Sequence, residues 1–310
     1  MRLLRETEGG AAFTRGSVAT IGNFDGVHLG HQALLKALRK KADALGLPLV
    51  VILFEPQPGE YFLKEQAPVR LTSLREKLQV LAQCQVDYVY CLKFNARLAS
   101  MPASQFAEQY FFSRMKIHYL LVGEDFRFGS RRLGDVALLK ALGEKAGCQV
   151  ATFPDFALEA NRVSSTKIRE ALSSGSLALA AKLLGRPFAL CGRVVKGKGL
   201  GRQWGIPTAN LALRRLSLPL LGVFCVRVQR AGEWLHGVAN LGNRPTVDGV
   251  NTLLEIHLFD FNEMIYGEML RVQFVHKLRD EMKFSSIDAL VAQIKEDISV
   301  AKRSFELIIE

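Results

Sequence analysis

The first half of the chain contains short apolar runs that alternate with amphipathic patterns of helical period. Between the first two runs, apolar residues recur every three or four positions from His31 to Leu45. They stop before Gly46 and Pro48, which predicts a helix that ends there. A second helical pattern covers residues 136–146. Alternating strands and helices favour a parallel sheet. The predicted strands are residues 17–21, 49–54, 88–92, 119–122 and 149–153.

The apolar pattern changes after residues 175–187, where a Gly-Arg-Pro segment ends a short helical stretch. Beyond it, apolar and polar residues alternate over 224–229 and 270–274, which is typical of antiparallel strands. A closing helix with an apolar stripe up to Ala301 is predicted to start at the Ser285-x-x-Asp288 capping pattern. We therefore predict a doubly wound α/β domain over 1–184 and a mostly antiparallel β domain over 185–310.

The composition is typical of a globular protein and leaves several ligand classes open. The chain has 310 residues, 49% of them hydrophobic, and a formal net charge of +11 that is spread over both predicted domains. This spread fits two sites for anionic ligands. A generally basic surface and a nucleic-acid platform are the alternatives.

Cysteine usage and the apolar stretches predict the compartment. The five cysteines are too scattered for a C-x-x-C metal knuckle and too few for a disulfide scaffold, so we expect reduced thiols in a cytoplasmic protein without zinc. The first six residues contain no apolar signal region, and Pro219 and Gly222 interrupt the longest apolar stretch. We expect neither secretion nor a membrane span.

The segment GNFDGVHLGH, residues 22–31, follows the first predicted strand and opens the first helix. His28 and His31 are three residues apart, next to backbone amides at the positive end of the helix dipole. Such a corner suits an anion, and its glycines allow phosphate oxygens to approach the backbone. Two histidines that only cap the helix and pack are the alternative. The candidate phosphate contacts besides the histidines are Gly22, Asn23, Phe24 and Gly30.

Two further segments favour a nucleotide site at the same sheet edge. The sequence SSTKIR, residues 164–169, puts hydroxyls and cations at a helix start, which suits the β- and γ-phosphates; an ordinary helix cap is the alternative. The sequence GEDFRFG, residues 123–129, follows the strand at 119–122, where adenine and ribose contacts are expected. The candidate ligand residues are Ser165, Thr166, Arg169, Gly123 and Asp125.

An aromatic and proline-rich loop, FEPQP at residues 54–58 with Tyr61 and Phe62, leaves the second predicted strand. Such a wall can stack a flat heterocycle such as isoalloxazine, or simply pack inside the domain. The candidate heterocycle contacts are Phe54, Pro56, Pro58 and Phe62.

A glycine-rich stretch over residues 192–210 is the most informative part of the second domain. Residues 192–198 resemble a Walker A loop, but Gly199 replaces the required Ser or Thr and the flanks are β, so we reject that motif. A glycine arch with nearby cations can fold over a polyphosphate, and a mobile surface loop is the alternative. The candidate ATP contacts are Gly192, Gly197, Lys198, Gly199, Gly201 and Arg202.

Three oxygen-bearing side chains complete this candidate site. Thr208 and Asn210 offer hard oxygen ligands suited to Mg²⁺ that is bound with nucleotide phosphates. Glu255 lies in an alternating segment, on the face opposite its apolar neighbours, and can take a proton from an attacking hydroxyl. An exposed strand charge is the alternative for Glu255.

The H-x-G-H pattern resembles the signature of class I nucleotidyltransferases. Over nearly its whole length the chain resembles the bacterial bifunctional riboflavin kinase/FMN adenylyltransferase (FAD synthetase) family. The N-terminal resemblance rests on residues 22–31, 54–58, 123–129 and 164–169. The C-terminal resemblance rests on LGRP at 184–187, the 192–210 stretch, GVANLGNRPT at 237–246, Glu255 and Tyr266-Gly267.

This resemblance implies an N-terminal nucleotidyltransferase domain and a C-terminal six-stranded Greek-key barrel with a closing helix. It implies that the barrel uses ATP to phosphorylate riboflavin to FMN, with Glu255 as general base and with Mg²⁺ and phosphates at Thr208 and Asn210. The N-terminal domain then adenylylates FMN to FAD, while His28, His31, Ser165, Thr166 and Arg169 orient and neutralise the leaving pyrophosphate.

Two rival interpretations remain. A nucleic-acid-binding protein needs aromatic residues interleaved with cations along its strands, and the sequence does not show them. A protein with one vestigial site would retain one activity, but both motif sets are intact. We therefore expect ATP, riboflavin and FMN as ligands, no nucleic acid and no membrane, and a monomer or weak homo-oligomer.

Overall fold

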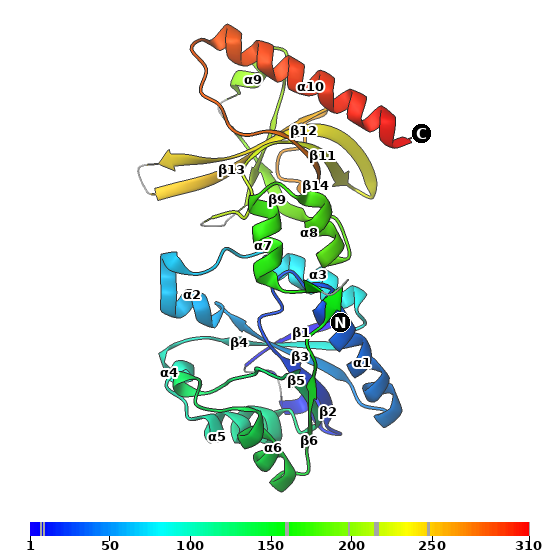
Figure 1. The fold of residues 1–310 in the computed structure, drawn as a ribbon, viewed down its shortest axis with the longest axis vertical. Helices are drawn as coiled ribbons and strands as arrows, with labels where there is room; N and C mark the ends of the chain where they lie inside the picture. The colour runs from blue at the N-terminus through cyan, green and yellow to red at the C-terminus, as the bar shows by residue number, and fades with distance from the viewer. Residues whose placement is uncertain are drawn as a thin grey trace. The chain divides into compact units, whose positions relative to one another are not determined.

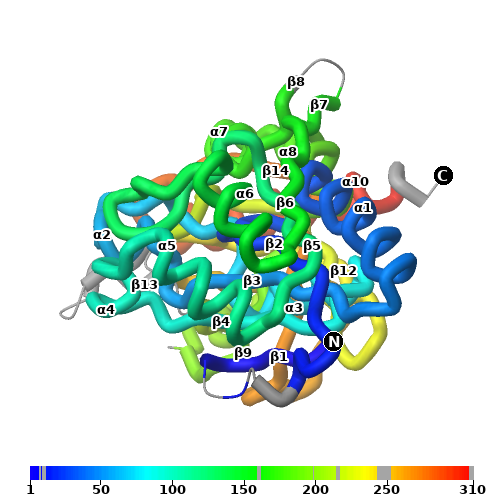
Figure 2. The backbone as a smooth tube through the Cα atoms, turned by 90° about the horizontal axis from the view of Figure 1, so that it is seen from below, coloured from blue at the N-terminus to red at the C-terminus, as the bar shows by residue number. Residues whose placement is uncertain are grey.

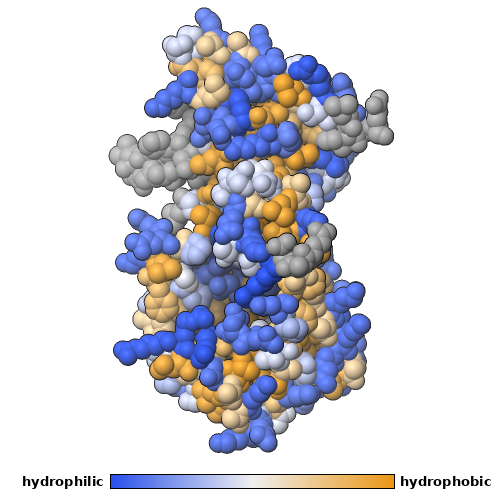
Figure 3. Space-filling model, viewed as in Figure 1, coloured by the Kyte–Doolittle hydropathy of each residue, from blue (hydrophilic) through white to orange (hydrophobic). Residues whose placement is uncertain are grey.

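The computed structural model describes residues 1–6, 8, 10–158, 161–197, 199–213, 217–246 and 249–309. Their contacts divide the chain into two compact units, one formed by Met1–Pro68 and Thr72–Ser164 and the other by Val69–Leu71 and Ser165–Glu310. We call them the sheet unit and the barrel unit. On the face drawn in Figure 3, hydrophilic residues are interspersed with apolar ones over both units.

Within its described residues, the sheet unit contains a six-stranded parallel sheet with the order β1-β4-β3-β2-β5-β6 (Figure 1). The five predicted strands all form, and β1 at the sheet edge is the one that the sequence analysis missed. The chain moves outward from β2 through β3 to β4 and then returns to the other side of β2 with β5. The strands are β1 (Arg2–Arg5), β2 (Ser17–Ile21), β3 (Leu49–Glu55), β4 (Tyr88–Lys93), β5 (Ile117–Gly123) and β6 (Gln149–Phe153).

Helices cover both faces of this sheet, so the predicted doubly wound arrangement is confirmed. One core contains residues of α1 and α3, and the other contains residues of α4, α5, α6 and a π-helical segment. The helices are α1 (Leu29–Leu45), α2 (Pro58–Leu63), α3 (Leu74–Gln83), α4 (Ala96–Ala99), α5 (Ala103–Phe106), the π-helix Ala107–Arg114 and α6 (Val136–Lys145). Short elements are the 3-10 turns Gly10–Phe13, Lys64–Gln66 and Ser130–Arg132 and the pair β7 (Ala157–Leu158) and β8 (Asn161–Arg162).

Helix α1 illustrates why the sequence folds in this way. His28 caps its start, with its Nδ1 accepting from the His31 backbone N–H at 3.4 Å, and Gly46 ends it in the left-handed conformation. The buried face repeats at helical spacing, and Figure 2 shows the coil of α1 at the side of the tube. The buried residues are Leu34, Leu35, Leu38 and Ala42.

The barrel unit closes an antiparallel barrel of six described strands in the order β10-β13-β12-β11-β14-β9. The alternation predicted for 224–229 and 270–274 is confirmed, because the apolar face of each segment is buried. The strands are β9 (Ala189–Val195), β10 (Ala209–Ala212), β11 (Gly222–Arg230), β12 (Glu233–Thr246), β13 (Gly249–Leu258) and β14 (Met269–Arg279). The helices are α7 (Ser165–Ser173), α8 (Leu177–Leu184), α9 (Leu200–Gln203) and α10 (Ile287–Ile309).

Helices α7 and α8 group with the barrel by their contacts, although they precede residue 185. The domain boundary between residues 184 and 185 stays a prediction, because contact grouping describes compactness and not independent folding.

Helix α10 packs on the outside of the barrel through Ala301 and Phe305, against Val223, Cys225 and Val238. Its start differs from the prediction by one residue: the Ser286 hydroxyl, and not that of Ser285, accepts from the Ala289 N–H at 3.2 Å. The reason is that the helix begins at Ile287, which makes Ser286 the capping position.

Helix α10 is also tied to the barrel by an ion pair. Arg279 at the end of β14 donates from Nε and Nη2 to the carboxylate of Asp297, at 3.0 and 2.8 Å. The Asp297 side chain is only 6% exposed. Removing one partner of such a pair leaves a buried charge without compensation.

We expect Asp297→Ala to destabilise the barrel unit by about 3–5 kcal/mol, because Arg279 loses its carboxylate. Calorimetry of the full chain should show a lower transition temperature for that unit. The matched control is Glu296→Ala, since Glu296 is 63% exposed and pairs with Arg303 at 3.7 Å. The Glu296→Ala control should lower the free energy of unfolding by less than about 1 kcal/mol. Equal losses of stability in both variants would contradict the role of Asp297 as an anchor of α10.

Candidate functional site

The predicted phosphate loop lies between the carboxyl end of β2 and the start of α1, where the sheet order reverses. The His28 and His31 rings stack with centroids 3.7 Å apart, and the Phe24 ring lies 4.7 Å from that of His31. A Cβ on Gly30 would lie 3.2 Å from the His28 ring, and one on Gly22 would lie 3.3 Å from the Phe24 ring. The two glycines therefore make room for rings of the same loop.

Helix α3 buttresses this loop, which the sequence analysis did not foresee. The buried Lys77 ammonium donates to the Asn23 carbonyl at 2.5 Å. The Asp25 carboxylate accepts from the Thr72 N–H at 3.1 Å, and the Thr72 hydroxyl accepts from the Gly26 N–H at 3.0 Å. These contacts hold a loop in which Phe24 and Val27 have positive φ, a conformation that non-glycine residues adopt only when their surroundings enforce it.

The electrostatics of the loop keep its second histidine neutral. Burial, and then the neighbouring His28 and Lys77, hold the pKa of His31 well below its usual 6.5. Its buried Nδ1 has no hydrogen-bond partner among the described residues. A neutral imidazole that has a buried ring nitrogen without such a partner, and that lies beside a lysine, suits a negatively charged ligand.

The other predicted nucleotide residues lie on two elements. Asp125 follows β5 and is 82% exposed, with one carboxylate oxygen 3.5 Å from Arg162. A Cβ on Gly123 would lie 3.2 Å from that carboxylate. Ser165 and Thr166 form the start of α7, and Arg169 on this helix donates to the Val69 carbonyl at 2.6 Å. Helix α7 belongs to the barrel unit, so its place beside His28 stays a prediction.

A pocket of about 440 Å³ lies at the carboxyl edge of the sheet. Phe54, Pro58 and Phe62, three of the four predicted heterocycle contacts, line it; Pro56 does not, and it follows Glu55 through a cis peptide bond. Arg131 and Arg132 lie in its wall, both with positive φ. The sequence analysis missed most of this wall, which also includes Ile21, Phe94, Leu98, Ala99, Phe106, Phe126, Arg127 and Phe128.

Strand pairing brings together three elements of the second candidate site. Asn210 on β10 lies directly opposite Glu255 on β13 and Val195 on β9. Glu255 is half-buried, whereas its neighbours Leu254 and Ile256 are fully buried, so the predicted alternation is confirmed. Directly opposed residues share one face of a sheet, and the Asn210 amide and the Glu255 carboxylate therefore point to the same side.

The glycine stretch folds over Asn210. A Cβ on Gly197 would lie 2.3 Å from the Asn210 amide nitrogen, and one on Gly201 would lie 2.4 Å from the Ile206 carbonyl. Gly199, with φ +72°, starts the single turn of α9. One short turn between antiparallel strands supports the rejection of a Walker A loop, which joins a strand to a long helix.

The remaining predicted ATP contacts lie in different places. Arg202 and the exposed Thr208 line a pocket of about 400 Å³ against the loop Phe261–Tyr266, which the sequence analysis had not assigned to a site. Gly192 lies inside β9, where a Cβ would come within 3.0 Å of Leu211, so close packing explains this glycine. Lys198 lies outside the described residues.

The described residues contain no cluster of three or more His, Cys, Asp or Glu side chains that could hold a metal ion. None of the described helices is long and apolar enough to cross a membrane.

Comparisons with known proteins agree with the two-unit geometry. The FAD synthetase family model matches residues 11–167, and the riboflavin kinase family model matches residues 184–305. The chain is 47% identical over 306 residues to the bifunctional riboflavin kinase/FMN adenylyltransferase of Haemophilus influenzae, covering 98% of this chain and 99% of that protein. It is 48% identical over 293 residues to the protein of that name from Escherichia coli strain K12, covering 94% of each.

A solved structure resembles the chain over nearly its full length. It is described as a macrolide-efflux protein from Streptococcus pneumoniae, and the TM-score is 0.83 at 32% sequence identity. The match covers 97% of this chain and 99% of that one.

We expect the His31 imidazole of the free protein to stay uncharged at about pH 6, because burial and the neighbouring His28 and Lys77 lower its pKa. The ring proton shifts of His31, assigned with a His31→Gln variant, should show no titration near 6.5. A group whose folded pKa is lowered contributes stability above its unfolded pKa and loses it as the pH falls through the folded value. The His31→Gln variant should therefore lose less free energy of unfolding than the parent between about pH 7 and pH 5. A titration midpoint of the His31 ring protons at or above pH 6.5 would contradict the lowered pKa.

Proposed function

Because this chain belongs to the bifunctional riboflavin kinase/FMN adenylyltransferase family, we propose that each unit performs one of the two reactions. The barrel unit uses ATP to phosphorylate riboflavin to FMN, and the sheet unit uses ATP to adenylylate FMN to FAD, with release of pyrophosphate. One observation carries the proposal: both family models match the same chain, in this order, each over a segment with its own pocket.

In the kinase reaction, Glu255 acts as the general base. Its carboxylate takes the proton of the ribityl 5′-hydroxyl while that oxygen attacks the γ-phosphorus, and ADP leaves. The glycine stretch around Gly197, Gly199 and Gly201, with Arg202, covers the ATP phosphates. The position of Asn210 opposite Glu255 supports this assignment, because it places a ligand for the phosphate end next to the base.

The residues at this site fit Mg²⁺. The Thr208 hydroxyl and the Asn210 amide are hard oxygen donors, and Gly197 lets the glycine stretch lie directly against the Asn210 amide, because a Cβ there would clash with it. An Mg²⁺ ion that is bound together with a nucleotide takes its remaining ligands from phosphates and water. When bound, such an ion neutralises charge on the transferred phosphoryl group.

In the adenylyltransferase reaction, the loop with His28 and His31 binds the triphosphate of ATP. The FMN phosphate is already ionised and attacks the α-phosphorus without needing a base, so this site works by positioning and electrostatics. His28, His31, Ser165, Thr166 and Arg169 orient the leaving pyrophosphate. Asn23 and Phe24, with Gly22 and Gly30, shape the loop, and Gly123 and Asp125 contact the nucleoside.

The aromatic pocket of the sheet unit takes the flavin ring. Its rings offer stacking surface, and the arginines in its wall suit a ligand that carries negative charge. Phe54, Pro58 and Phe62 are the proposed ring contacts, and Pro56 shapes the loop between them.

The proposal includes a cytoplasmic enzyme that is a monomer or weak homo-oligomer. The scattered spacing of the five cysteines, which suits neither a disulfide scaffold nor a metal knuckle, supports a reducing compartment. Light scattering of the purified chain measures the oligomeric state.

The whole proposal is tested by chromatography of riboflavin incubated with the protein, ATP and Mg²⁺. We expect FMN and then FAD. FMN alone would indicate a vestigial sheet unit. FAD formed only from added FMN would indicate a vestigial barrel unit. The formation of neither FMN nor FAD would refute the proposal. Nucleic-acid affinity that survives saturating ATP and exceeds flavin affinity would favour the rival interpretation.

We expect Glu255→Gln to reduce FMN formation by at least about 100-fold, because the amide cannot accept the hydroxyl proton. Conversion of FMN to FAD should persist in the same preparation. Glu233→Gln, which changes an exposed carboxylate at the start of β12, is the matched control and should leave both rates unchanged. Loss of both activities in folded Glu255→Gln would argue against separate sites.

We expect His28→Ala to show the reverse pattern. Loss of the ring removes both the cap of α1 and a donor to the phosphates, so FAD formation should fall by about 100-fold or more while riboflavin phosphorylation continues. The exposed His118, changed to Ala, is the control. Unchanged FAD formation in His28→Ala would exclude a role of this ring in catalysis.

A further inference from the structure

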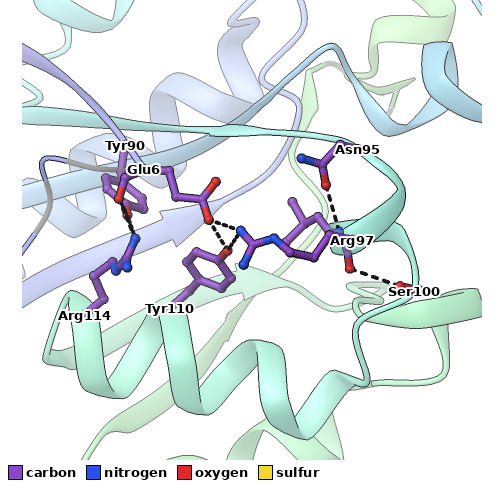
Figure 4. Close-up of polar contacts among 8 residues, drawn as sticks. Glu6, Tyr90, Asn95, Arg97, Ser100, Tyr110 and Arg114 are labelled. Carbon is purple, nitrogen blue, oxygen red and sulfur yellow. Dashed lines mark hydrogen bonds and ion pairs between the residues drawn. The ribbon is translucent and has the colours of Figure 1, made fainter.

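A polar cluster at the edge of the sheet unit is not used by either proposed reaction. Glu6, directly after β1, accepts a hydrogen bond from the Tyr110 hydroxyl at 2.6 Å and pairs with the Arg97 guanidinium (Figure 4). Arg97 also donates to the Tyr110 hydroxyl at 3.1 Å. One carboxylate thus connects the N-terminal segment to α4, which carries Arg97, and to the π-helix, which carries Tyr110.

The backbone of Glu6 makes a second set of contacts. Its carbonyl accepts from the Tyr90 hydroxyl at 3.2 Å and from the Arg114 guanidinium at 2.5 Å. Arg114 also donates to the Tyr90 hydroxyl at 3.3 Å. Glu6 is therefore held by strand β4 and by the end of the π-helix, as Figure 4 shows, so that its carboxylate has a defined position.

Charge and burial make the carboxylate contact strong. Tyr110 is fully buried, and the Glu6 side chain is only 23% exposed. Burial, and then the hydrogen bond to Glu6, raise the pKa of Tyr110 to about 12, so the phenol keeps its proton and remains a donor. A hydrogen bond to an ionised partner in such a place is stronger than one between neutral groups.

Of the two elements that Glu6 connects, α4 lines the aromatic pocket, and the π-helix continues directly from α5, whose last residue, Phe106, lines it. Leu98 and Ala99 of α4, the residues directly after Arg97, line that pocket. Phe106 lines it as well, and the Tyr110 ring packs on the Phe106 ring with centroids 5.1 Å apart. Phe106 in turn lies 6.3 Å from the Phe54 ring. A short chain of contacts therefore leads from the Glu6 carboxylate to the surface that faces a ligand.

We propose that Glu6 is a positioning residue for FMN adenylation, which sets the width of the flavin pocket by holding α4 and the π-helix at a fixed separation. This inference rests on the proposed function of the aromatic pocket. Glu6 touches neither substrate, and its effect is transmitted through Tyr110 and Phe106 and through the turn of α4. Without the carboxylate, the two walls separate and the flavin ring loses contact area.

The test variant is Glu6→Gln, which keeps the size of the side chain but removes its charge. We expect the KM for FMN in FAD formation to rise about five-fold. The binding free energy of such a change is a part of what one buried hydrogen bond to a charged group contributes. The kcat, the KM for ATP and the rate of riboflavin phosphorylation should all stay within about two-fold. A purely structural role would lower all the activities of the sheet unit together.

Asp87→Asn is the matched control. Asp87 lies just before β4 and accepts from Arg39 at 2.7 Å and from the Leu49 N–H at 2.8 Å, so the change again turns a carboxylate that pairs with arginine into an amide. Neither Asp87 nor Arg39 lines the aromatic pocket. The control should lower the thermal stability of the sheet unit and leave the KM for FMN unchanged.

Tyr110→Phe gives a second measurement that does not depend on a charge change, and it serves alone if Glu6→Gln does not fold. It removes only the hydroxyl and should raise the KM for FMN about two- to three-fold. An unchanged KM for FMN in folded variants, or equal changes in kcat and in both KM values, would overturn the inference. Absence of FAD formation by the parent chain would instead refute the proposed function, so the two failures are distinguishable.

Discussion

The parallel pairing of β2 with β3 on one side and β5 on the other is the constraint on which the sheet unit depends. Parallel strands all end at the same edge, and the reversal of strand order next to β2 leaves a gap between the loops that follow β2 and β5. The His28 loop and the segment after Gly123 both start there. The aromatic pocket uses the same edge, because Ile21, Phe54 and Phe94 lie at or just beyond the ends of three strands.

In the barrel unit the corresponding constraint is antiparallel pairing with period two. Burial of Leu211, Leu254 and Ile256 forces the intervening Asn210 and Glu255 onto the other face, where the register places them opposite each other. A shift of one residue would exchange these faces and bury the carboxylate. The packing of the barrel therefore also orders the groups proposed for catalysis.

Buried and partly buried charges connect these frameworks to their loops and helices. Lys77 contacts the loop that carries His28 and His31, Asp297 anchors α10, and Glu6 connects the N-terminal segment to α4 and the π-helix. Lys77 and Glu6 have partners 54 and 104 residues away, whereas Asp297 pairs with Arg279 of the preceding strand, 18 residues away. His31 differs from them, because it remains neutral and retains a buried nitrogen without a partner among the described residues. That difference is expected of a group that completes its contacts with a ligand.

The sequence by itself determined the fold class, the family, and the local motifs of both candidate sites. Hydrophobic periodicity is a local property that packing did not override in these strands, in α1 or in α10, and glycine and histidine spacing is local as well. Only the tertiary structure decided that Lys77 supports Asn23, that the loop Phe261–Tyr266 lines the barrel pocket, and that Glu6 reaches Tyr110. The partners Lys77 and Asn23 are 54 residues apart and Glu6 and Tyr110 are 104 apart, so only the packing of whole elements brings them together.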